Sequence, residues 1–298
     1  MKVERHGRNV HRFTFELAAN EEQEFLLISD LHIDNPHCRR DLLKRDLDEA
    51  KKRGAKVIIN GDFFCIMQGK ADPRHTKKDI RPEHMGANYF QLVRDEAIEF
   101  MRPYAHNIAL IGYGNHETAV LKRQEFDLLA DFVTLLNERT GANVQLGGYS
   151  GWIIFGAIRK NTDTTTSLKL KYHHGYGGGG EVTKGIIQNQ RQMAAVHGAD
   201  IVWMGHVHEM YHVVDMAESL RSFRGDYKVV HKPVHHVRTS TYKDEFADGA
   251  GGYHIEKGRK IKPLGGVWMT VRIHREHSGV EKNMAVVEFK QTDTYYHQ

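Results

Sequence analysis

The stretch FLLISDLH at residues 25–32 decides how the chain is interpreted. The run at 25–29 has the length and apolar character of a buried strand, and Asp30 and His32 follow directly. Alternate residues of an extended chain point to the same side, so this Asp-x-His pair would present two metal-type ligands to one place. We therefore predict a strand that ends at a cation site.

Four more apolar runs are followed by residues of the same kind. They lie at 57–60, 108–111, 168–172 and 201–204, and the residues that follow them are Gly61-Asp62, Gly114-Asn115-His116-Glu117, His173-His174-Gly175 and Gly205-His206-Val207-His208. In open α/β sheets, ligands bind beyond the carboxyl ends of the strands. We therefore expect the strand ends to meet at one edge of a sheet and to form a single cleft.

Helical patterns separate several of these runs. Apolar residues recur at helical spacing over 42–50, 90–101, 124–139 and 183–197, and further strands are expected at 152–158, 211–216, 267–274 and 284–290. Strands that alternate with helices indicate a layered α/β fold. We expect a single domain over 1–298, whose β-rich part at 211–298 forms a second sheet. The polar stretch at about 66–88 is either a substrate-facing lid or a solvated loop.

Composition excludes several classes of protein. The chain is 40% hydrophobic and 27% charged, which is typical of a globular protein, and its net charge of +4 is too small to identify nucleic acid as a partner. Two cysteines cannot form a disulfide framework, the N-terminus has no signal-like apolar region, and no apolar run reaches the roughly 18 residues of a membrane span. We expect a cytoplasmic protein with no membrane partner. The 21 histidines are the unusual feature, because histidine is the commonest metal ligand.

The order of the five blocks resembles the calcineurin-like metallophosphoesterase superfamily. Asp-x-His, Gly-Asp, Gly-Asn-His-Glu, His-Gly and Gly-His-x-His follow one another in the family order between residues 25 and 210. The resemblance implies a four-layer α/β/β/α sandwich of two mixed sheets with flanking helices, and a binuclear metal site at the C-terminal ends of the strands. The stretch RTSTY at 238–242 is similar to the tails of phage and bacterial members.

The resemblance also implies which residues hold two divalent metal ions. Position by position, these are Asp30, His32 and His208 for the first ion, Asn115, His174 and His206 for the second, and Asp62 as a bridge between both. A donor set of nitrogen and oxygen without thiolate suits manganese first, with iron or zinc as alternatives. His173 is the alternative to His174, which we favour because the family ligand directly precedes glycine.

The function that the resemblance implies is hydrolysis of phosphate esters by a hydroxide that bridges the metals. His116 would give a proton to the leaving oxygen or stabilise its charge, and candidate substrate contacts are Asn115, His116, Arg238 and Tyr242. We expect a phosphodiesterase that acts on a nucleotide or nucleic acid, rather than a monoesterase. A DNA or RNA nuclease of the same fold and a non-catalytic metal-binding scaffold remain open, and so does a homo-oligomer.

The second block departs from the family pattern. Protein phosphatases of the superfamily have Gly-Asp-x-x-Asp there, and the last aspartate orients the histidine of the third block. This chain has Cys65 at that position and lacks the arginine that follows, which argues against a phosphoprotein phosphatase. The group that orients His116 is therefore open, with Asp34 as one candidate.

Overall fold

The structure is a computed structural model, and it describes residues 1–7, 9–66, 75–162, 165–180, 182–223, 225–246, 255, 258–278 and 280–293. Its helices are α1 (Arg40–Arg53), α2 (Tyr89–Met101), α3 (Asn115–Gln124), α4 (Leu128–Thr140) and α5 (Ile186–Ala195), with short 3-10 helices η1 (Lys77–Asp79), η2 (Pro82–His84) and η3 (Arg102–Tyr104). Its strands are β1 (Lys2–Gly7), β2 (Val10–Leu17), β3 (Glu22–Ile28), β4 (Lys56–Asn60), β5 (Ile108–Gly112), β6 (Gln145–Leu146), β7 (Ser150–Arg159), β8 (Thr165–His173), β9 (Ile201–Met204), β10 (Tyr211–Phe223), β11 (Asp226–Arg238), β12 (Val267–Ser278) and β13 (Val280–Gln291).

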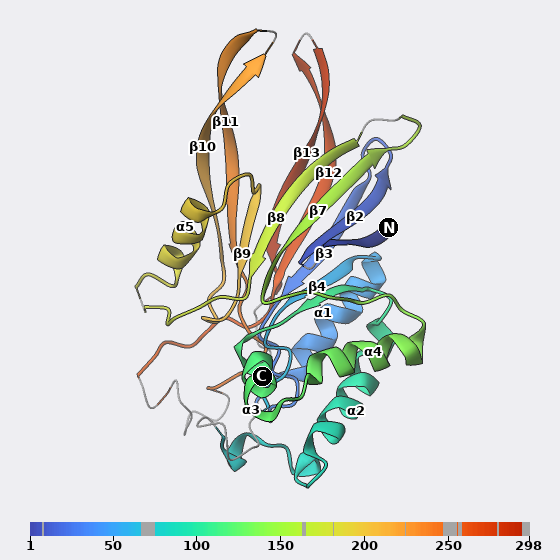
Figure 1. The fold of residues 1–298 in the computed structure, drawn as a ribbon, viewed down its shortest axis with the longest axis vertical. Helices are drawn as coiled ribbons and strands as arrows, with labels where there is room; N and C mark the ends of the chain where they lie inside the picture. The colour runs from blue at the N-terminus through green and yellow to red at the C-terminus, as the bar shows by residue number, and fades with distance from the viewer. Residues whose placement is uncertain are drawn as a thin grey trace.

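The strands form two mixed sheets, which confirms the predicted α/β class. One sheet has seven strands in the order β1-β2-β7-β8-β9-β11-β10, and the other has six in the order β13-β12-β3-β4-β5-β6. Parallel pairs such as β3–β4 and β8–β9 lie beside antiparallel pairs such as β7–β8 and β12–β13 in these sheets. The ribbon shows α1, α2 and α4 on the side of β4 and β5, and α5 beside β9 (Figure 1).

The core between the sheets is built from alternate residues of the facing strands. Phe13 and Phe155 of the seven-stranded sheet contact Phe25 of the six-stranded sheet, and the ring centroids of Phe25 and Phe155 lie 4.7 Å apart. A second cluster of buried side chains lies between the six-stranded sheet and the helices, and it includes Leu47, Phe63 and Phe132. These layers hold the two sheets in a fixed relation to each other.

The helix boundaries follow local capping groups. Gly54 ends α1 in the left-handed conformation with φ of 64°. The helix expected over 124–139 instead begins at Leu128, because the Asp127 side chain accepts a hydrogen bond from the Ala130 amide and caps α4. Residues 115–124 form a separate helix, α3, whose weaker apolar pattern did not reveal it.

The C-terminal part of the chain differs from the prediction. It does not form a second sheet of its own: the β10–β11 hairpin joins the seven-stranded sheet, and the β12–β13 hairpin joins the six-stranded sheet. Periodicity alone could not assign these hairpins to different sheets, because that choice depends on long-range pairing. The N-terminal strands β1 and β2 and the strand β11 were also not predicted from the sequence.

The predicted lid or loop at 66–88 is described only in part. Of the stretch at 66–88, residues 67–74 lie outside the described residues, and the described remainder packs Ile80 and His84 into the protein. Among the described residues, no helix is both long enough and apolar enough to cross a membrane.

Candidate metal centre

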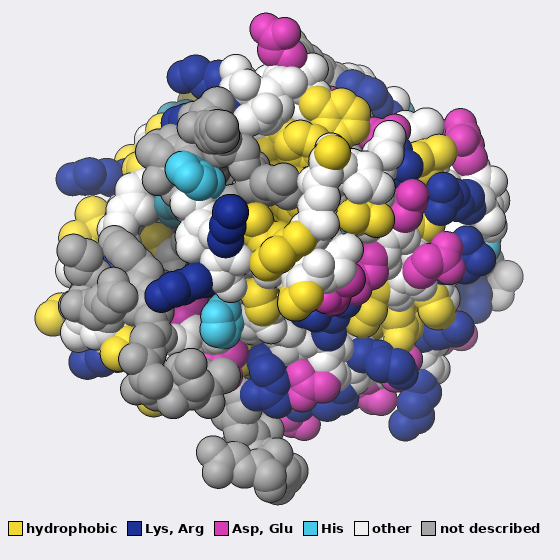
Figure 2. All heavy atoms as spheres, turned by 90° about the horizontal axis from the view of Figure 1, so that it is seen from below, with side chains coloured by type: hydrophobic (Ala, Val, Ile, Leu, Met, Phe, Trp, Pro, Cys, Tyr) yellow, Lys and Arg dark blue, Asp and Glu magenta, His cyan; other side chains and the backbone are white. Residues whose placement is uncertain are grey.

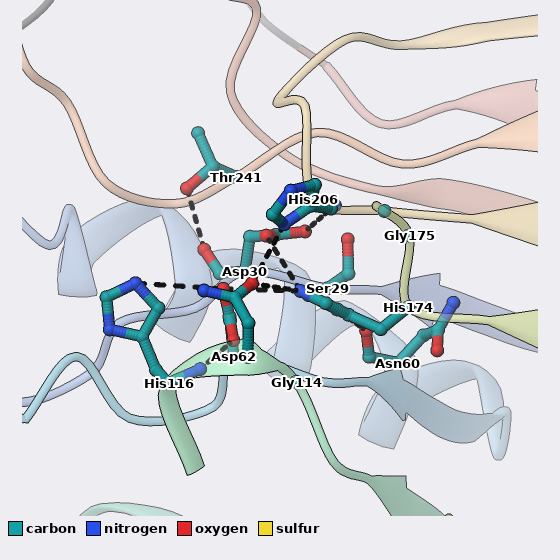
Figure 3. Close-up of polar contacts among 12 residues, drawn as sticks. Ser29, Asp30, Asn60, Asp62, Gly114, His116, His174, Gly175, His206 and Thr241 are labelled. Carbon is teal, nitrogen blue, oxygen red and sulfur yellow. Dashed lines mark hydrogen bonds and ion pairs between the residues drawn. The ribbon is translucent and has the colours of Figure 1, made fainter. Parts of the chain in front are cut away.

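The predicted ligands lie together at the ends of five strands, and these strands belong to both sheets. Asp30 follows β3, Asp62 follows β4 and Asn115 follows β5 in the six-stranded sheet, whereas His174 follows β8 and His206 follows β9 in the other. The expected single sheet edge is therefore wrong, since the ligands lie at one end of the sandwich, where two sheet edges meet. Side chains from the two sheets converge there (Figure 3).

The backbone at the candidate ligands is left-handed rather than extended. Positive φ angles occur at five of them: Asp30 (53°), His32 (48°), Asp62 (48°), His206 (73°) and His208 (55°). The expectation that an extended backbone directs the side chains of Asp30 and His32 to the same place is therefore wrong. Non-glycine residues rarely adopt this conformation, and each instance costs about 1–3 kcal/mol unless the surroundings hold it in place.

Hydrogen bonds between neighbouring loops hold these left-handed residues. The Asp30 amide donates to the Gly61 carbonyl at 3.0 Å, and the His32 amide donates to the Asp62 carbonyl at 3.1 Å. The His206 amide donates to Asp30 Oδ2 at 3.0 Å, which joins the β9 loop to the β3 loop. The strained backbone is thus fixed by contacts between the same loops that carry the candidate ligands.

The first group of candidate ligands consists of Asp30, His32 and His208. One ligand atom of each lies within 4.8 Å of the others, and Asp30 Oδ1 is 3.4 Å from His208 Nε2. Asp30 Oδ1 and both ring nitrogens of His32 are buried and lack a hydrogen-bond partner among the described residues. Buried polar atoms without partners are rare in proteins, and a cation at this place would satisfy them.

The second group consists of Asp62, His174 and His206, with Asn115 beside them. Asp62 Oδ2 is 3.2 Å from His174 Nε2, and Asn115 Oδ1 lies 2.8 Å from His206 Nδ1 and 3.2 Å from His174 Nε2. The other ring nitrogen of His174 is 2.7 Å from the Asn60 carbonyl, which fixes the ring so that Nε2 faces the group. His173 instead accepts a hydrogen bond from the Gly175 amide, and it is not in the group.

Charge in the centre is balanced between carboxylates and His174. Burial raises the pKa of the Asp62 carboxyl, but the positive charges of His174 and His116 outweigh burial and hold it well below its usual value. Burial lowers the pKa of His174, but Asp62 and Asp30 outweigh burial and raise it to about 10. Without a metal, His174 therefore holds a proton between the two carboxylates, and a bound cation would take the place of that proton.

Two glycines permit the close approach of the loops. A Cβ atom at Gly114 would collide with the Oδ1 and the amide of Asp62, and one at Gly205 would lie 2.5 Å from Ser29 Oγ and 2.6 Å from Asp30 Oδ2. Any other residue at either position would displace a candidate ligand. This explains in physical terms why glycine precedes both Asn115 and His206.

His116 lies beside the centre at the start of α3. Its Nδ1 is 2.5 Å from the Cys65 carbonyl, so Nδ1 donates there, and its Nε2 lies 3.9 Å from Asp62 Oδ2. The carboxylate of Asp34 accepts hydrogen bonds from the Cys65 and Ile66 amides at 2.5 and 2.8 Å. A backbone carbonyl therefore orients the His116 ring, and Asp34 holds the loop that supplies this carbonyl.

Glu117 supports the centre through hydrogen bonds to the backbone, a role that its residue type alone did not predict. Its carboxylate is buried and accepts hydrogen bonds from the amides of Asp62, Phe64 and Gly114 at 3.2, 2.9 and 2.8 Å. Burial and the nearby Asp62 charge raise the pKa of Glu117 to about 8. This one side chain therefore ties the β4 loop to the β5 loop. Its place directly after the Asn-His pair is the only signal in the sequence that could have indicated this.

The structure places Arg238 and Tyr242 in the packing around the centre. The Arg238 guanidinium is buried and donates to the carbonyls of Gly205 and Gly185, and the Tyr242 hydroxyl donates to Asp46 Oδ2 at 2.7 Å. Both contacts support a structural role for these side chains. The neighbouring Thr241 hydroxyl donates to the Asp30 carbonyl at 2.7 Å, so the 238–242 segment braces the first loop (Figure 3).

The donor set fits divalent cations. Burial holds the pKa of His32 well below its usual value, so this imidazole is neutral and keeps a lone pair for a metal. Each group offers imidazole nitrogens and a carboxylate oxygen, and Asn115 adds an amide oxygen. Such mixed nitrogen and oxygen donors are typical of manganese, iron and zinc sites.

Comparisons with known proteins give only distant likenesses. No protein-family model and no curated protein matches this sequence. Among solved structures, the chain is similar to Vps29 of Chaetomium thermophilum, at 10% identity and a TM-score of 0.33 over 92% of this chain and 98% of that one. It is also similar to GAP50, the anchor in the inner membrane complex of Plasmodium, at 10% identity and a TM-score of 0.36 over 92% and 87% of the chains. At this level, the likeness identifies no family and supports no argument about function.

Proposed function

We propose that this protein is a metal-dependent phosphoesterase that hydrolyses phosphodiesters. The observation that carries the proposal is the convergence of two ligand groups on one buried place, with Asp62 in the second group and His116 at the edge. Two divalent ions held by these groups would supply a water of lowered pKa and neutralise the charge of a phosphate. The ligand roles are those assigned from the resemblance, and manganese is the ion we expect first.

The chain's own residues would bind and orient the substrate. Asn115 directs its Oδ1 at the two histidine rings, so its NH₂ group is left to donate to a phosphate oxygen. His116 holds its Nε2 near the carboxylate of Asp62 while Nδ1 is engaged by Cys65. When protonated, this Nε2 can give its proton to the leaving oxygen, which typically contributes about 10²–10⁴-fold to the rate.

The surface at the end of the sandwich that carries the candidate ligands is mixed in charge. Figure 2 shows lysine and arginine side chains interspersed with acidic ones and hydrophobic side chains near the middle of the view. A continuous basic track would favour a polyanion such as DNA. The visible described surface shows a mixed distribution, so we propose a nucleotide-sized phosphodiester as the substrate class, with nucleic acid as a further member of the test panel.

The test is hydrolysis of an aryl phosphodiester, an aryl phosphomonoester, cyclic nucleotides and DNA by the full chain with added manganese. We expect turnover of a phosphodiester that His116→Ala lowers by about 10²–10⁴-fold without loss of bound manganese. His173→Ala is the matched control, because this adjacent histidine lies outside both ligand groups. Bound manganese without turnover of any substrate would contradict the proposal and would favour a non-catalytic scaffold.

A further inference from the structure

A hollow of about 460 Å³ lies next to the candidate metal centre, between the β1–β2 turn, the β6–β7 turn and α3. Its volume is within the range of pockets that bind a small molecule, which is about 300–1,000 Å³. The residues that line it combine aromatic, apolar and polar side chains, and they include Asn9, Tyr113, Thr118, Leu121, Asp127 and Tyr149.

One side of α3 leads from the metal centre to this hollow. Asn115 begins the helix and directs its Oδ1 at His174 and His206, and Thr118 and Leu121 follow at intervals of three residues. Residues three apart are neighbours on the surface of a helix, and three residues span about 4.5 Å of its axis. The side of α3 that begins with a candidate ligand therefore continues into the lining of the hollow.

Tyr149 belongs both to the hollow and to the surroundings of the centre. Its ring lies edge to face with that of His174, with centroids 5.4 Å apart, and its hydroxyl donates to the Gly175 carbonyl at 2.7 Å. Burial raises the pKa of Tyr149, and the negative charges of Asp62 and Asp30 raise it further, so the hydroxyl keeps its proton. The hollow thus has a fixed, neutral aromatic ring on the side of the candidate ligands.

The other lining residues suit a flat ligand with a polar edge. The Tyr113 hydroxyl donates to Asp127 Oδ2 at 2.7 Å, which holds this second aromatic side chain in place. Nucleobases stack on tyrosine rings because every base has a π-face. Asn9 adds an amide that both donates and accepts hydrogen bonds, and Asp127 adds a carboxylate that accepts them. Such groups recognise the edges of nucleobases.

We propose that this hollow binds the base of a nucleotide phosphodiester whose phosphate lies at the metal centre, an inference that rests on the proposed function. The base contacts Tyr113 and Tyr149, and Leu121 covers it at the rim, where this side chain is 43% exposed. The hollow would therefore make the protein specific for nucleotide esters over phosphodiesters that lack a base.

The test compares two p-nitrophenyl phosphodiesters, the methyl ester and the ester of thymidine monophosphate, as substrates of the manganese-loaded full chain. Both have the same leaving group, so the ratio of their KM values reports the contribution of the nucleoside. We expect a KM about 10-fold lower for the thymidine ester, which corresponds to the stacking of one base. Equal KM values for the two esters would overturn the inference.

Leu121→Trp places a larger side chain at the rim of the hollow. We expect it to raise the KM of the thymidine ester more than that of the methyl ester, so that the ratio approaches one. Leu220→Trp, at a position of β10 that is 66% exposed, is the matched control and should keep the wild-type ratio. A ratio that Leu121→Trp leaves unchanged would place the base elsewhere and overturn the inference.

Binding without turnover separates this inference from the proposed function. Calorimetry with the manganese-loaded chain compares thymidine monophosphate with inorganic phosphate, and we expect about 10-fold tighter binding of the nucleotide. Leu121→Ala, which removes the apolar contact without filling the hollow, should reduce this difference. If the difference is present but no phosphodiester is hydrolysed, only the proposed function fails. If phosphodiesters are hydrolysed but the nucleoside changes neither KM nor affinity, only the further inference fails.

Discussion

The two ends of the β-sandwich differ in which side chains they bury: one end buries charged side chains, and the other leaves apolar side chains exposed. At the loop end, where β3, β4, β5, β8 and β9 run into the candidate ligands, Asp30, Asp62 and His174 are buried. At the arm end, where the β10–β11 and β12–β13 hairpins project beyond the other strands (Figure 1), Met216 and Leu220 are 63% and 66% exposed. One end buries charge, and the other exposes apolar side chains.

Pairing register explains the exposed apolar groups. Leu220 pairs with Val229, and His212 pairs with Val237, which lies in the core between the sheets. Because alternate residues share a face, Met216 and Leu220 continue the core-facing side of the sheet beyond the point where the two hairpins diverge. The same strand pattern therefore produces a core residue near the loop end and an exposed one near the arm end.

The largest expected effect is that of Asp62→Asn at the loop end. This change removes the negative charge of the second ligand group, whose Asp62 Oδ2 lies 3.2 Å from His174 Nε2. We expect manganese binding to weaken and phosphodiester hydrolysis to fall by at least about 10²-fold, measured by calorimetry and by steady-state rates. Asp226→Asn, at an exposed position of the arm end, is the matched control and should change neither quantity.

A smaller effect is expected from Glu117→Gln. The amide cannot accept three backbone hydrogen bonds as the carboxylate does, so the β4 and β5 loops should hold their ligands less firmly. We expect manganese affinity to fall about 10–100-fold, as measured by calorimetry. Glu218→Gln on the exposed β10 strand serves as the control, and an unchanged affinity in Glu117→Gln would show that the carboxylate does not position the ligands.

A third prediction concerns His11, a buried histidine away from the loop end. Both of its ring nitrogens lack a hydrogen-bond partner among the described residues, and burial lowers its pKa to about 4. Because the unfolded chain binds a proton below about pH 6.5 and the folded chain only below about 4, this group lowers stability as pH falls through that window, by up to about 1.4 kcal/mol per pH unit.

His11→Leu should therefore raise the free energy of unfolding, and more at pH 5 than at pH 7.5. Urea denaturation at the two pH values measures this difference. His231→Leu, on the exposed arm, is the matched control, because its ring is 61% exposed. Equal pH slopes in the wild type and in His11→Leu would contradict the prediction.

The smallest effect is expected from Met216→Ser on the arm. This side chain is 63% exposed, so the free energy of unfolding should change by no more than about 0.5 kcal/mol. The same substitution at Met269, which is fully buried between the sheets, should cost about 2–5 kcal/mol. A large loss of stability in Met216→Ser would mean that the Met216 side chain is covered, and the two ends of the sandwich would then differ less.

The sequence by itself determined which residue types lie at the candidate metal centre and most of the strands that carry them. Short apolar runs at 25–29, 57–60, 108–111 and 201–204 predicted β3, β4, β5 and β9, because a buried parallel strand requires such a run. The residues that follow them contain the carboxylates, imidazoles and amide that form the ligand groups, and residue type is visible without a fold.

Only the tertiary structure decided how these residues meet. It showed that two sheets share the centre, that left-handed backbone aims Asp30 and His206, and that the Cys65 carbonyl orients His116. It also placed the β10–β11 hairpin in one sheet and the β12–β13 hairpin in the other. The physical reason is that local periodicity records which side of a strand is apolar. Strand pairing, loop conformation and backbone hydrogen bonds depend on contacts between residues far apart in the chain.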